Sequence, residues 1–119
     1  MKQASRKKIH IIEDESDLCM LLREYFVRKN YEVTCAHSLN KGMATLYEIS
    51  PDILFLDDNL PDGTGWNHAN NIARDMPDMF IVLISAFRPV VPDMPTGAKF
   101  QVIEKPISMA ELNKQFAEF

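Results

Sequence analysis

The sequence predicts a single α/β domain in which one parallel five-stranded sheet is covered by helices on both faces. Short apolar runs typical of strands alternate along the chain with longer stretches of helical periodicity. Two of the runs, 52–57 and 79–85, are continuously apolar, as expected for central strands that are covered on both sides. The length of 119 residues, 46% of them hydrophobic, suits one core. Because crossovers between parallel strands are right-handed, the repeated strand–helix order indicates a doubly wound architecture.

The first strand and the first helix are predicted within residues 8–30. Residues 8–12, KIHII, form a short apolar run, and apolar side chains then recur at helical spacing through residues 16–30. Those side chains are Leu18, Leu21, Leu22, Tyr25 and Phe26. Ser16 is the predicted N-cap, and Asn30 suits the left-handed position that closes such a helix.

A second strand and helix are predicted within residues 31–50. Apolar and polar side chains alternate over residues 31–36, a pattern typical of a half-buried strand. Ser38 then opens a helix whose apolar side is made of Leu39, Met43, Leu46 and Tyr47. This helix is expected to end before Pro51, because a proline ring disfavours helical backbone in the preceding residue.

The two central strands are expected to be joined by a helix over residues 65–76. Its sequence, GWNHANNIARDM, is less regular than that of the other helices but long enough to cross over the sheet. The fifth strand is predicted at 100–105 and the last helix at 108–119. Ser108 and Glu111 match a capping box at the start of that helix.

The segment between the fourth and fifth strands departs from the repeat. Residues 86–96, AFRPVVPDMPT, contain Pro89, Pro92 and Pro95. Each proline inside a helix costs on the order of 3 kcal/mol and removes a backbone hydrogen bond. The fourth helix of the repeat is therefore expected to be absent, or one turn long at most.

Charge and hydropathy exclude several classes of protein. A formal net charge of -4 and a pI of about 5.3 provide no general footprint for nucleic acid, so direct nucleic-acid binding is not expected. Four basic residues, Lys2, Arg6, Lys7 and Lys8, are assigned to a flexible lead-in, 1–8, before a domain that spans 9–119. No stretch resembles a secretory signal or reaches membrane-spanning length. We expect a cytoplasmic protein that does not bind membranes.

The cysteines and histidines carry no evident chemical motif. Cys19 and Cys35 stand apart on separate predicted elements, without a close pair or a histidine at ligand spacing. They are expected to be buried, reduced thiols. The three histidines, His10, His37 and His68, lie on different elements, and structural or surface roles are expected for them.

Charged and polar residues follow the ends of several predicted strands. They are Glu13 and Asp14 after the first strand, Asp57 and Asp58 after the third, Ser85 after the fourth and Lys105 after the fifth. In doubly wound sheets, ligands bind outside the carboxyl ends of the strands. We therefore expect these side chains to converge there.

The chemistry of this group favours a magnesium and phosphate site. Three crowded carboxylates repel one another unless a cation is present, and Mg²⁺ prefers carboxylate, water and phosphate oxygens. Glu13, Asp14 and Asp57 are thus predicted to hold Mg²⁺. The hydroxyl of Ser85 and the ammonium of Lys105 suit phosphate oxygens. A carboxylate can also take a phosphoryl group itself as a nucleophile.

Together these motifs resemble the response-regulator receiver domain of two-component signalling, a CheY-like domain. The resemblance extends from Ile9 to the last helix. Its motifs are an acidic pair after the first strand, an aspartate four residues before a proline, a serine after the fourth strand and a Lys-Pro pair after the fifth. The matching residues are Glu13 with Asp14, Asp57 with Pro61, Ser85 with Ala86, and Lys105 with Pro106.

The resemblance implies a flavodoxin-like sheet in the order 2-1-3-4-5 and a signalling domain that is not an enzyme. It makes Asp57 the acceptor of a phosphoryl group from a histidine kinase or a phosphotransfer protein, with Lys105 and Ser85 beside it. The added charge is expected to switch a surface that an unknown downstream protein or effector domain binds.

The resemblance also indicates which of the two adjacent aspartates is the acceptor and how each metal ligand contacts the ion. Asp57 is chosen over Asp58 because it stands four residues before Pro61, and strand alternation places the two side chains on opposite faces. Among the metal ligands, the resemblance implies direct contact by Asp14, contact through water by Glu13, and a further ligand from the backbone carbonyl of Asn59.

Some positions differ from the family pattern. Val102 stands three residues before Lys105, where the family carries an aromatic residue that reports the state of the site. Phe100 is near, and whether it substitutes is left open. Phe87 and Asn59 lie where the family tunes the access of water to the acyl phosphate, so the phosphoryl lifetime is also open.

Two other functions fit parts of the pattern. The first is a receiver-like scaffold that binds partners without phosphorylation. It is suggested because the site is intact, whereas the aromatic switch residue and the fourth helix, which contributes to the output face in the family, are expected to be missing. A haloacid-dehalogenase-type phosphatase also uses an aspartate nucleophile, but it requires a second aspartate where this chain has Asn59. Taken singly, Asp57 is consistent with a residue that starts a loop, and Lys105 with the solvated end of a strand. Only the combination of these residues favours a functional site.

Overall fold

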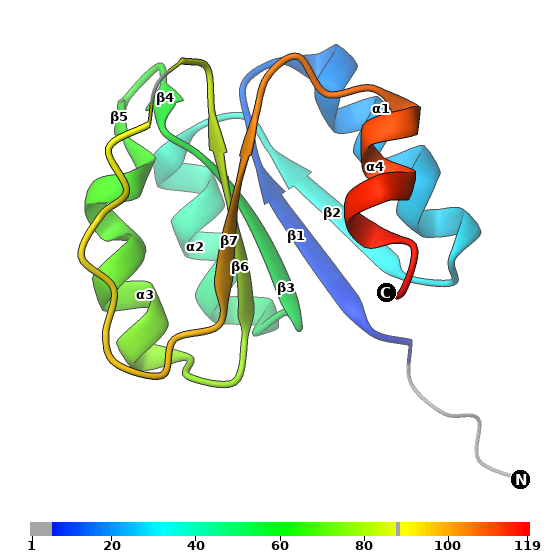
Figure 1. The fold of residues 1–119 in the computed structure, drawn as a ribbon. Helices are drawn as coiled ribbons and strands as arrows, with labels where there is room; N and C mark the ends of the chain where they lie inside the picture. Colours follow the sequence, from blue (N-terminus) through cyan, green and yellow to red (C-terminus); the bar gives the residue numbers. More distant parts are fainter. Residues whose placement is uncertain (1–5, 88) are drawn as a thin grey trace, which may run out of the picture.

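The protein forms five parallel strands with connecting helices in the computed structural model, which describes residues 6–87 and 89–119 (Figure 1). The elements in chain order are β1 (Lys8–Ile12), α1 (Ser16–Arg28), β2 (Glu32–Ala36), α2 (Leu39–Ile49), β3 (Ile53–Asp57), β4 (Asn59–Leu60), β5 (Gly63–Thr64), a 3₁₀ turn (Gly65–His68), α3 (Ala69–Asp75), β6 (Phe80–Ser85), β7 (Phe100–Glu104) and α4 (Met109–Phe116). Of the expected lead-in, residues 1–5 lie outside the described residues, while Lys8 already belongs to β1.

The sheet has the order β2-β1-β3-β6-β7, and all of its neighbouring strands are parallel. Since β6 and β7 are the fourth and fifth strands of this sheet, the order is the predicted 2-1-3-4-5. Every residue of β3 is buried, and so are five of the six residues of β6. The prediction of a flavodoxin-like, doubly wound sheet is confirmed.

Helices cover the sheet on both faces and enclose two hydrophobic clusters (Figure 1). On one face, α1 and α4 pack against aromatic side chains, and the Phe26 ring lies 5.5 Å from that of Phe55 and 5.6 Å from that of Phe116. On the other face, α2 and α3 contribute Leu46 and Ile72. Because side chains alternate along a strand, neighbouring residues of β3 pack into opposite clusters, and both faces of the strand are buried.

Most predicted helix ends are confirmed, and one is wrong. Asn30 has φ 71°, Ser38 caps α2 through its side chain, and α2 ends at Ile49 ahead of Pro51. Ser16, however, is not the N-cap of α1: it is the first helical residue and Glu15 occupies the cap, so the Ser16 hydroxyl does not take the N-cap position.

The connection between β3 and β6 contains a hairpin that the sequence reading did not predict. Strands β4 and β5 pair antiparallel, and Asp62 in their turn accepts hydrogen bonds from the backbone N–H groups of Leu39 (2.7 Å) and Asn40 (2.9 Å). These contacts cap α2 from a distant loop and lower the pKa of Asp62. The expected helix over 65–76 begins as a 3₁₀ turn and becomes α3.

The proline-rich segment follows the prediction. Residues 89–97 contain no helix; residue 88 lies outside the described residues. The segment packs against the α2–α3 face through Met94, and the side chain of Asn70 donates a 2.8 Å hydrogen bond to the carbonyl of Asp93. Val90 remains 89% exposed. In the part of the chain that the structure describes, no helix combines the length and apolar character that crossing a membrane requires.

The cysteines correct one expectation. Cys19 is buried, but Cys35 is only half-buried. The Nδ1 atom of His37 also lies 3.8 Å from the Cys19 sulfur. Both cysteines are free, as expected, and the expectation of burial was wrong for Cys35.

His10 has the expected structural role. It is fully buried, its Nε2 donates to the Gly42 carbonyl at 3.0 Å, and its Nδ1 lies 2.7 Å from the Thr34 hydroxyl. Burial lowers its pKa from 6.5, against the raising effect of these hydrogen bonds. The neutral ring therefore joins β1 to β2 and α2.

Replacing Gly65 is expected to distort the backbone at the C-terminal end of β3. A Cβ atom at this position would collide with the carbonyl oxygen of Asp57, a backbone atom that cannot rotate away. Gly65→Ala should lower the free energy of unfolding by roughly 1–3 kcal/mol, as overpacking does. Thr64→Ala, an exposed neighbour, is the matched control. Urea unfolding measures both, and equal stability of the two variants would contradict this close approach.

His10 should lower the stability of the protein in mild acid, whereas Glu13 and Asp57, whose pKa values are raised, act in the opposite direction. A lowered pKa in the folded state means that the unfolded chain binds the proton more readily, so His10 contributes stability above pH 6.5 that is lost as the pH falls. The loss approaches about 1.4 kcal/mol per pH unit. Urea unfolding at several pH values should show that His10→Gln loses less stability, or gains more, than the wild type as the pH falls below 6.5. An unchanged pH dependence in His10→Gln would contradict this role of His10.

Candidate functional site

Three carboxylates meet at the C-terminal end of the sheet. Glu13 and Asp14 follow β1, and Asp57 ends β3, which is the neighbouring strand. One oxygen atom from each residue lies within 4.8 Å of the others. Glu13 and Asp57 are buried, whereas Asp14 is exposed. We call these three residues the acidic cluster.

A single lysine faces the acidic cluster from the loop after β7. The Nζ atom of Lys105 lies 3.0 Å from Oε1 of Glu13, 3.6 Å from Oδ2 of Asp57 and 3.2 Å from Oε2 of Glu15. The sequence reading did not assign Glu15 to the site. Its place directly after Glu13 and Asp14 was the available signal, but its contact with Lys105 depends on the turn into α1.

Burial and neighbouring charge shift the pKa values in this group. Burial raises the pKa of Glu13 to about 7, against the hydrogen bond from the Glu15 backbone and the contact with Lys105. Burial likewise raises the pKa of Asp57, opposed by the charge of Lys105. For Lys105, burial lowers the pKa, but the contacts with Glu13 and Asp57 outweigh it and raise the value.

The buried oxygen atoms fit a hard cation. Oε1 of Glu13 and Oδ2 of Asp57 are shielded from solvent and face Lys105, with no other hydrogen-bond donor among the described residues. Buried carboxylate oxygens that lack donors are costly unless a cation neutralises them. An all-oxygen set of this kind suits Mg²⁺ rather than zinc or iron.

The two adjacent aspartates have different surroundings. Asp57 is 1% exposed, and its carboxylate lies 3.6 Å from the ammonium of Lys105. Asp58 instead supports the turn: its carbonyl accepts from the Gly65 backbone at 2.9 Å, and its side chain accepts from the Trp66 backbone at 3.4 Å. Only Asp57 therefore belongs to the acidic cluster.

Ser85 and Asn59 lie on the strands that border the cluster. Ser85 is buried at the end of β6, next to β3, and its carbonyl accepts a 2.7 Å hydrogen bond from the Lys105 backbone. Asn59 begins β4 and is exposed. The side chains of Asp57, Ser85 and Lys105 thus come from three adjacent strand ends.

The aromatic residue considered as a substitute switch lies at the far end of its strand. Phe100 pairs with Ile81, whereas Ser85 pairs with Glu104 at the other end of β7. Four residues of strand separate the two ends, roughly 13 Å. Phe100 packs against the α2–α3 cluster, as does Val102. This position argues against Phe100 as a direct sensor of the site.

A surface pocket of about 540 Å³ borders Lys105. Its walls come from α1 and from the loops after β6 and β7, and they combine apolar and acidic side chains. The lining residues are Glu15, Asp17, Leu18, Leu21, Ala86, Lys105, Pro106 and Ile107.

The chain is similar to known proteins over nearly its whole length. It matches the family model for the response regulator receiver domain over residues 9–117. Among solved structures, a CheY-like receiver domain protein from Methanospirillum hungatei JF-1 is 20% identical with a TM-score of 0.78, covering 96% of this chain and 93% of that one. The chemotaxis protein CheY4 from Vibrio cholerae is 18% identical with a TM-score of 0.74, covering 92% and 95%.

A third structure pairs such a domain with a kinase. The crystal structure of the histidine kinase ThkA in complex with the response regulator protein TrrA contains a chain that is 25% identical to this one, with a TM-score of 0.72 and coverage of 91% and 93%. The family match over residues 9–117, the sheet order and the motifs at the strand ends agree with one another. The chain therefore belongs to the response regulator receiver domain family.

Proposed function

We propose that Asp57 takes a phosphoryl group from a histidine kinase or a phosphotransfer protein in a Mg²⁺-dependent reaction. The observation that carries this proposal is that the Asp57 carboxylate, a member of the acidic cluster, is only 1% exposed and lies 3.6 Å from the ammonium of Lys105. A buried carboxylate with raised pKa has little structural use in that position. It is well suited to act as a nucleophile once a cation neutralises its neighbours.

The transfer forms one bond and breaks another. A carboxylate oxygen of Asp57 attacks phosphorus, the phosphorus–nitrogen bond of the donor phosphohistidine breaks, and the imidazole leaves with the electron pair. Glu13, Asp14 and the Asn59 carbonyl are the proposed Mg²⁺ ligands with Asp57, and the ion would supply charge neutralisation at the phosphoryl oxygens. Lys105 is proposed to pair with one of those oxygens, and the Ser85 hydroxyl to donate to another.

The switch is proposed to act through Lys105. This ammonium contacts Glu13 and Glu15 as well as Asp57, so a phosphoryl group with a charge of about -2 on Asp57 competes for it. Movement of Lys105 would alter the adjoining pocket that Leu18, Leu21 and Ile107 line. A downstream protein or effector domain is the proposed reader of this change.

We further infer that residues 9–119 act as a cytoplasmic signalling domain without turnover of a substrate. A scaffold that is not regulated by phosphorylation is the second candidate. Two observations favour it: Val102 replaces the usual aromatic residue, and residues 89–97 lack the helix that contributes to the usual output face.

Phosphorylation is expected at Asp57 alone. Incubation with Mg²⁺ and a small phosphodonor should add about 80 Da, one phosphoryl group, to the intact protein. Asp57→Asn should abolish this gain, because an amide is not a nucleophile of this kind. Asp58→Asn is the matched control and should retain the gain, since Asp58 is turned toward the Trp66 backbone. Intact-protein mass spectrometry provides the measurement.

Three results would count against the proposal. Absence of any mass gain in the wild type would favour the scaffold. A gain that persists in Asp57→Asn but disappears in Asp58→Asn would reverse the assignment of the two aspartates. Continuous release of phosphate from many esters would favour an enzyme.

Magnesium binding is expected to depend on the acidic cluster. Isothermal titration calorimetry should detect one Mg²⁺ site in the wild type, and Asp14→Asn should weaken its affinity about tenfold or more, because a direct carboxylate ligand is lost. Asp17→Asn removes an exposed carboxylate on the first turn of α1 and should leave the affinity unchanged. Equal weakening by both variants would show that the effect is one of overall charge, and the proposed site would be wrong.

A further inference from the structure

Strand β2 is an edge of the sheet, and its outer side has no neighbouring strand in the part of the chain that the structure describes. Its one paired neighbour there is β1, and the Glu32 N–H donates to the Lys7 carbonyl at 2.9 Å. The backbone groups of successive residues in a parallel strand point to opposite sides. The N–H and C=O groups of Val33 and Cys35 therefore point away from β1. Such a row of backbone groups is a template for a further strand.

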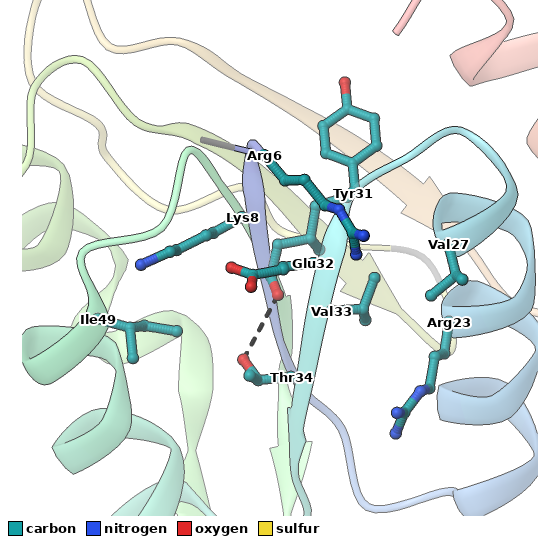
Figure 2. A pocket seen from close by; sticks show the side chains of 10 residues that line it. Arg6, Lys8, Arg23, Val27, Tyr31, Glu32, Val33, Thr34 and Ile49 are labelled. Atoms are coloured by element: carbon teal, nitrogen blue, oxygen red, sulfur yellow. Dashed lines mark hydrogen bonds between the residues drawn. The ribbon is translucent and has the colours of Figure 1, made fainter. Parts of the chain in front are cut away.

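A groove of about 450 Å³ lies at this edge, between the two helices that cover the sheet beside β2. Figure 2 shows the edge with Ile49 of α2 on one side and Val27 and Arg23 of α1 on the other. Val27 is 50% exposed, and Ile49 and Val33 are half-buried. Apolar side chains are thus accessible on both sides of the open backbone, as an added strand with alternating side chains requires.

The groove carries an excess of positive charge, although the whole chain has a net charge of -4. Its lining contains three cations, Arg6, Lys8 and Arg23, and one carboxylate, that of Glu32. Among residues 6–87 and 89–119, none of these three cations belongs to an ion pair. Figure 2 places Lys8 toward the α2 side and Arg23 on the α1 side. The charge of the groove is therefore complementary to an acidic ligand.

The same charge disfavours a second copy of this chain as the occupant. Pairing of two β2 edges would bring two grooves with excess positive charge against each other. The strand itself, EVTCA, offers one carboxylate to neutralise them. An acidic segment of another protein suits the edge better, because its backbone can pair with β2 while its carboxylates neutralise the cations.

We propose that the edge of β2 is a docking site for an extended, acidic segment of a partner protein, which binds as an additional strand. The backbone of this segment pairs with the outward N–H and C=O groups of Val33 and Cys35, and its carboxylates pair with Lys8 and Arg23. Apolar side chains between the carboxylates pack on the walls of the groove. The acidic cluster is built on β1 and β3, so this docking requires neither Mg²⁺ nor phosphorylation.

The test measures peptide binding to the purified wild-type protein without Mg²⁺ or a phosphodonor, so its outcome is independent of the proposed function. Three labelled peptides are compared by fluorescence anisotropy: Glu-Val-Glu-Val-Glu, its lysine counterpart Lys-Val-Lys-Val-Lys, and the rearranged peptide Glu-Glu-Glu-Val-Val. The first should bind about tenfold or more tightly than the other two, because it alone combines negative charge with strand alternation.

Hydrogen exchange locates the bound peptide. In the ¹⁵N-labelled protein, Glu-Val-Glu-Val-Glu should slow the exchange of the Val33 and Cys35 amides, whose N–H groups gain acceptors. The amides of β7, at the other edge of the sheet, should exchange as before. Protection on β7 without protection on β2 would overturn the proposal.

Two variants separate charge from backbone pairing. Arg23→Glu should weaken binding of Glu-Val-Glu-Val-Glu about tenfold or more, whereas Arg74→Glu, an exposed position on α3, should leave it unchanged. Val33→Pro removes an outward N–H that β1 does not use, which an edge strand tolerates, and it should abolish binding. Circular dichroism checks that this variant folds.

Three results would show that the proposal is wrong. Equal affinity for the alternating and the rearranged acidic peptide would show that charge alone attracts them. Tighter binding of the lysine peptide would contradict the charge of the groove. A dimer of the wild type alone, in which the Val33 and Cys35 amides are protected, would show that a second copy occupies the edge. These wild-type readouts decide the matter even if Val33→Pro does not fold.

Discussion

The structure depends on an imbalance of charge at the C-terminal end of a hydrophobic sheet. The three carboxylates of the acidic cluster, two of them buried, and the carboxylate of Glu15 surround one ammonium, which leaves an excess of negative charge that a divalent cation reduces. Without such an ion, burial favours protons on Glu13 and Asp57. Burial of these groups is costly, and the two apolar clusters that hold β1 and β3 in place offset that cost.

The position of Asp57 follows from close packing of backbone around the end of β3. Asp58 turns away to accept hydrogen bonds from the next turn, and Gly65 allows that turn to approach the Asp57 carbonyl. The turn of the β4–β5 hairpin in turn caps α2 through Asp62. The site is therefore held by the strand and by the loop that follows it, which explains how adjacent aspartates acquire different surroundings.

The fold is shared with receiver domains at about one-fifth identity. Residues 89–97, the proline-rich segment, form a connection without a helix beside α3, and Val90 lies open to solvent there (Figure 1). On the opposite face, Cys19 of α1 and Cys35 of β2 pack in the same hydrophobic cluster. The Cys19 thiol donates to the carbonyl of Glu13, a member of the acidic cluster.

The sequence by itself determined the features that depend on local pattern: the strands and helices, the loss of a helix to three prolines, and the strand ends at which charged residues gather. The hydrophobic period, the prolines and the capping residues act over a few neighbouring residues. The carboxyl ends of the strands in a parallel sheet lie at one side of the sheet, independently of the conformation of the loops. Only the tertiary structure decided which distant groups touch. The contact of Glu15 with Lys105 and the cap that Asp62 provides both depend on how whole elements pack, and no local spacing encodes those distances.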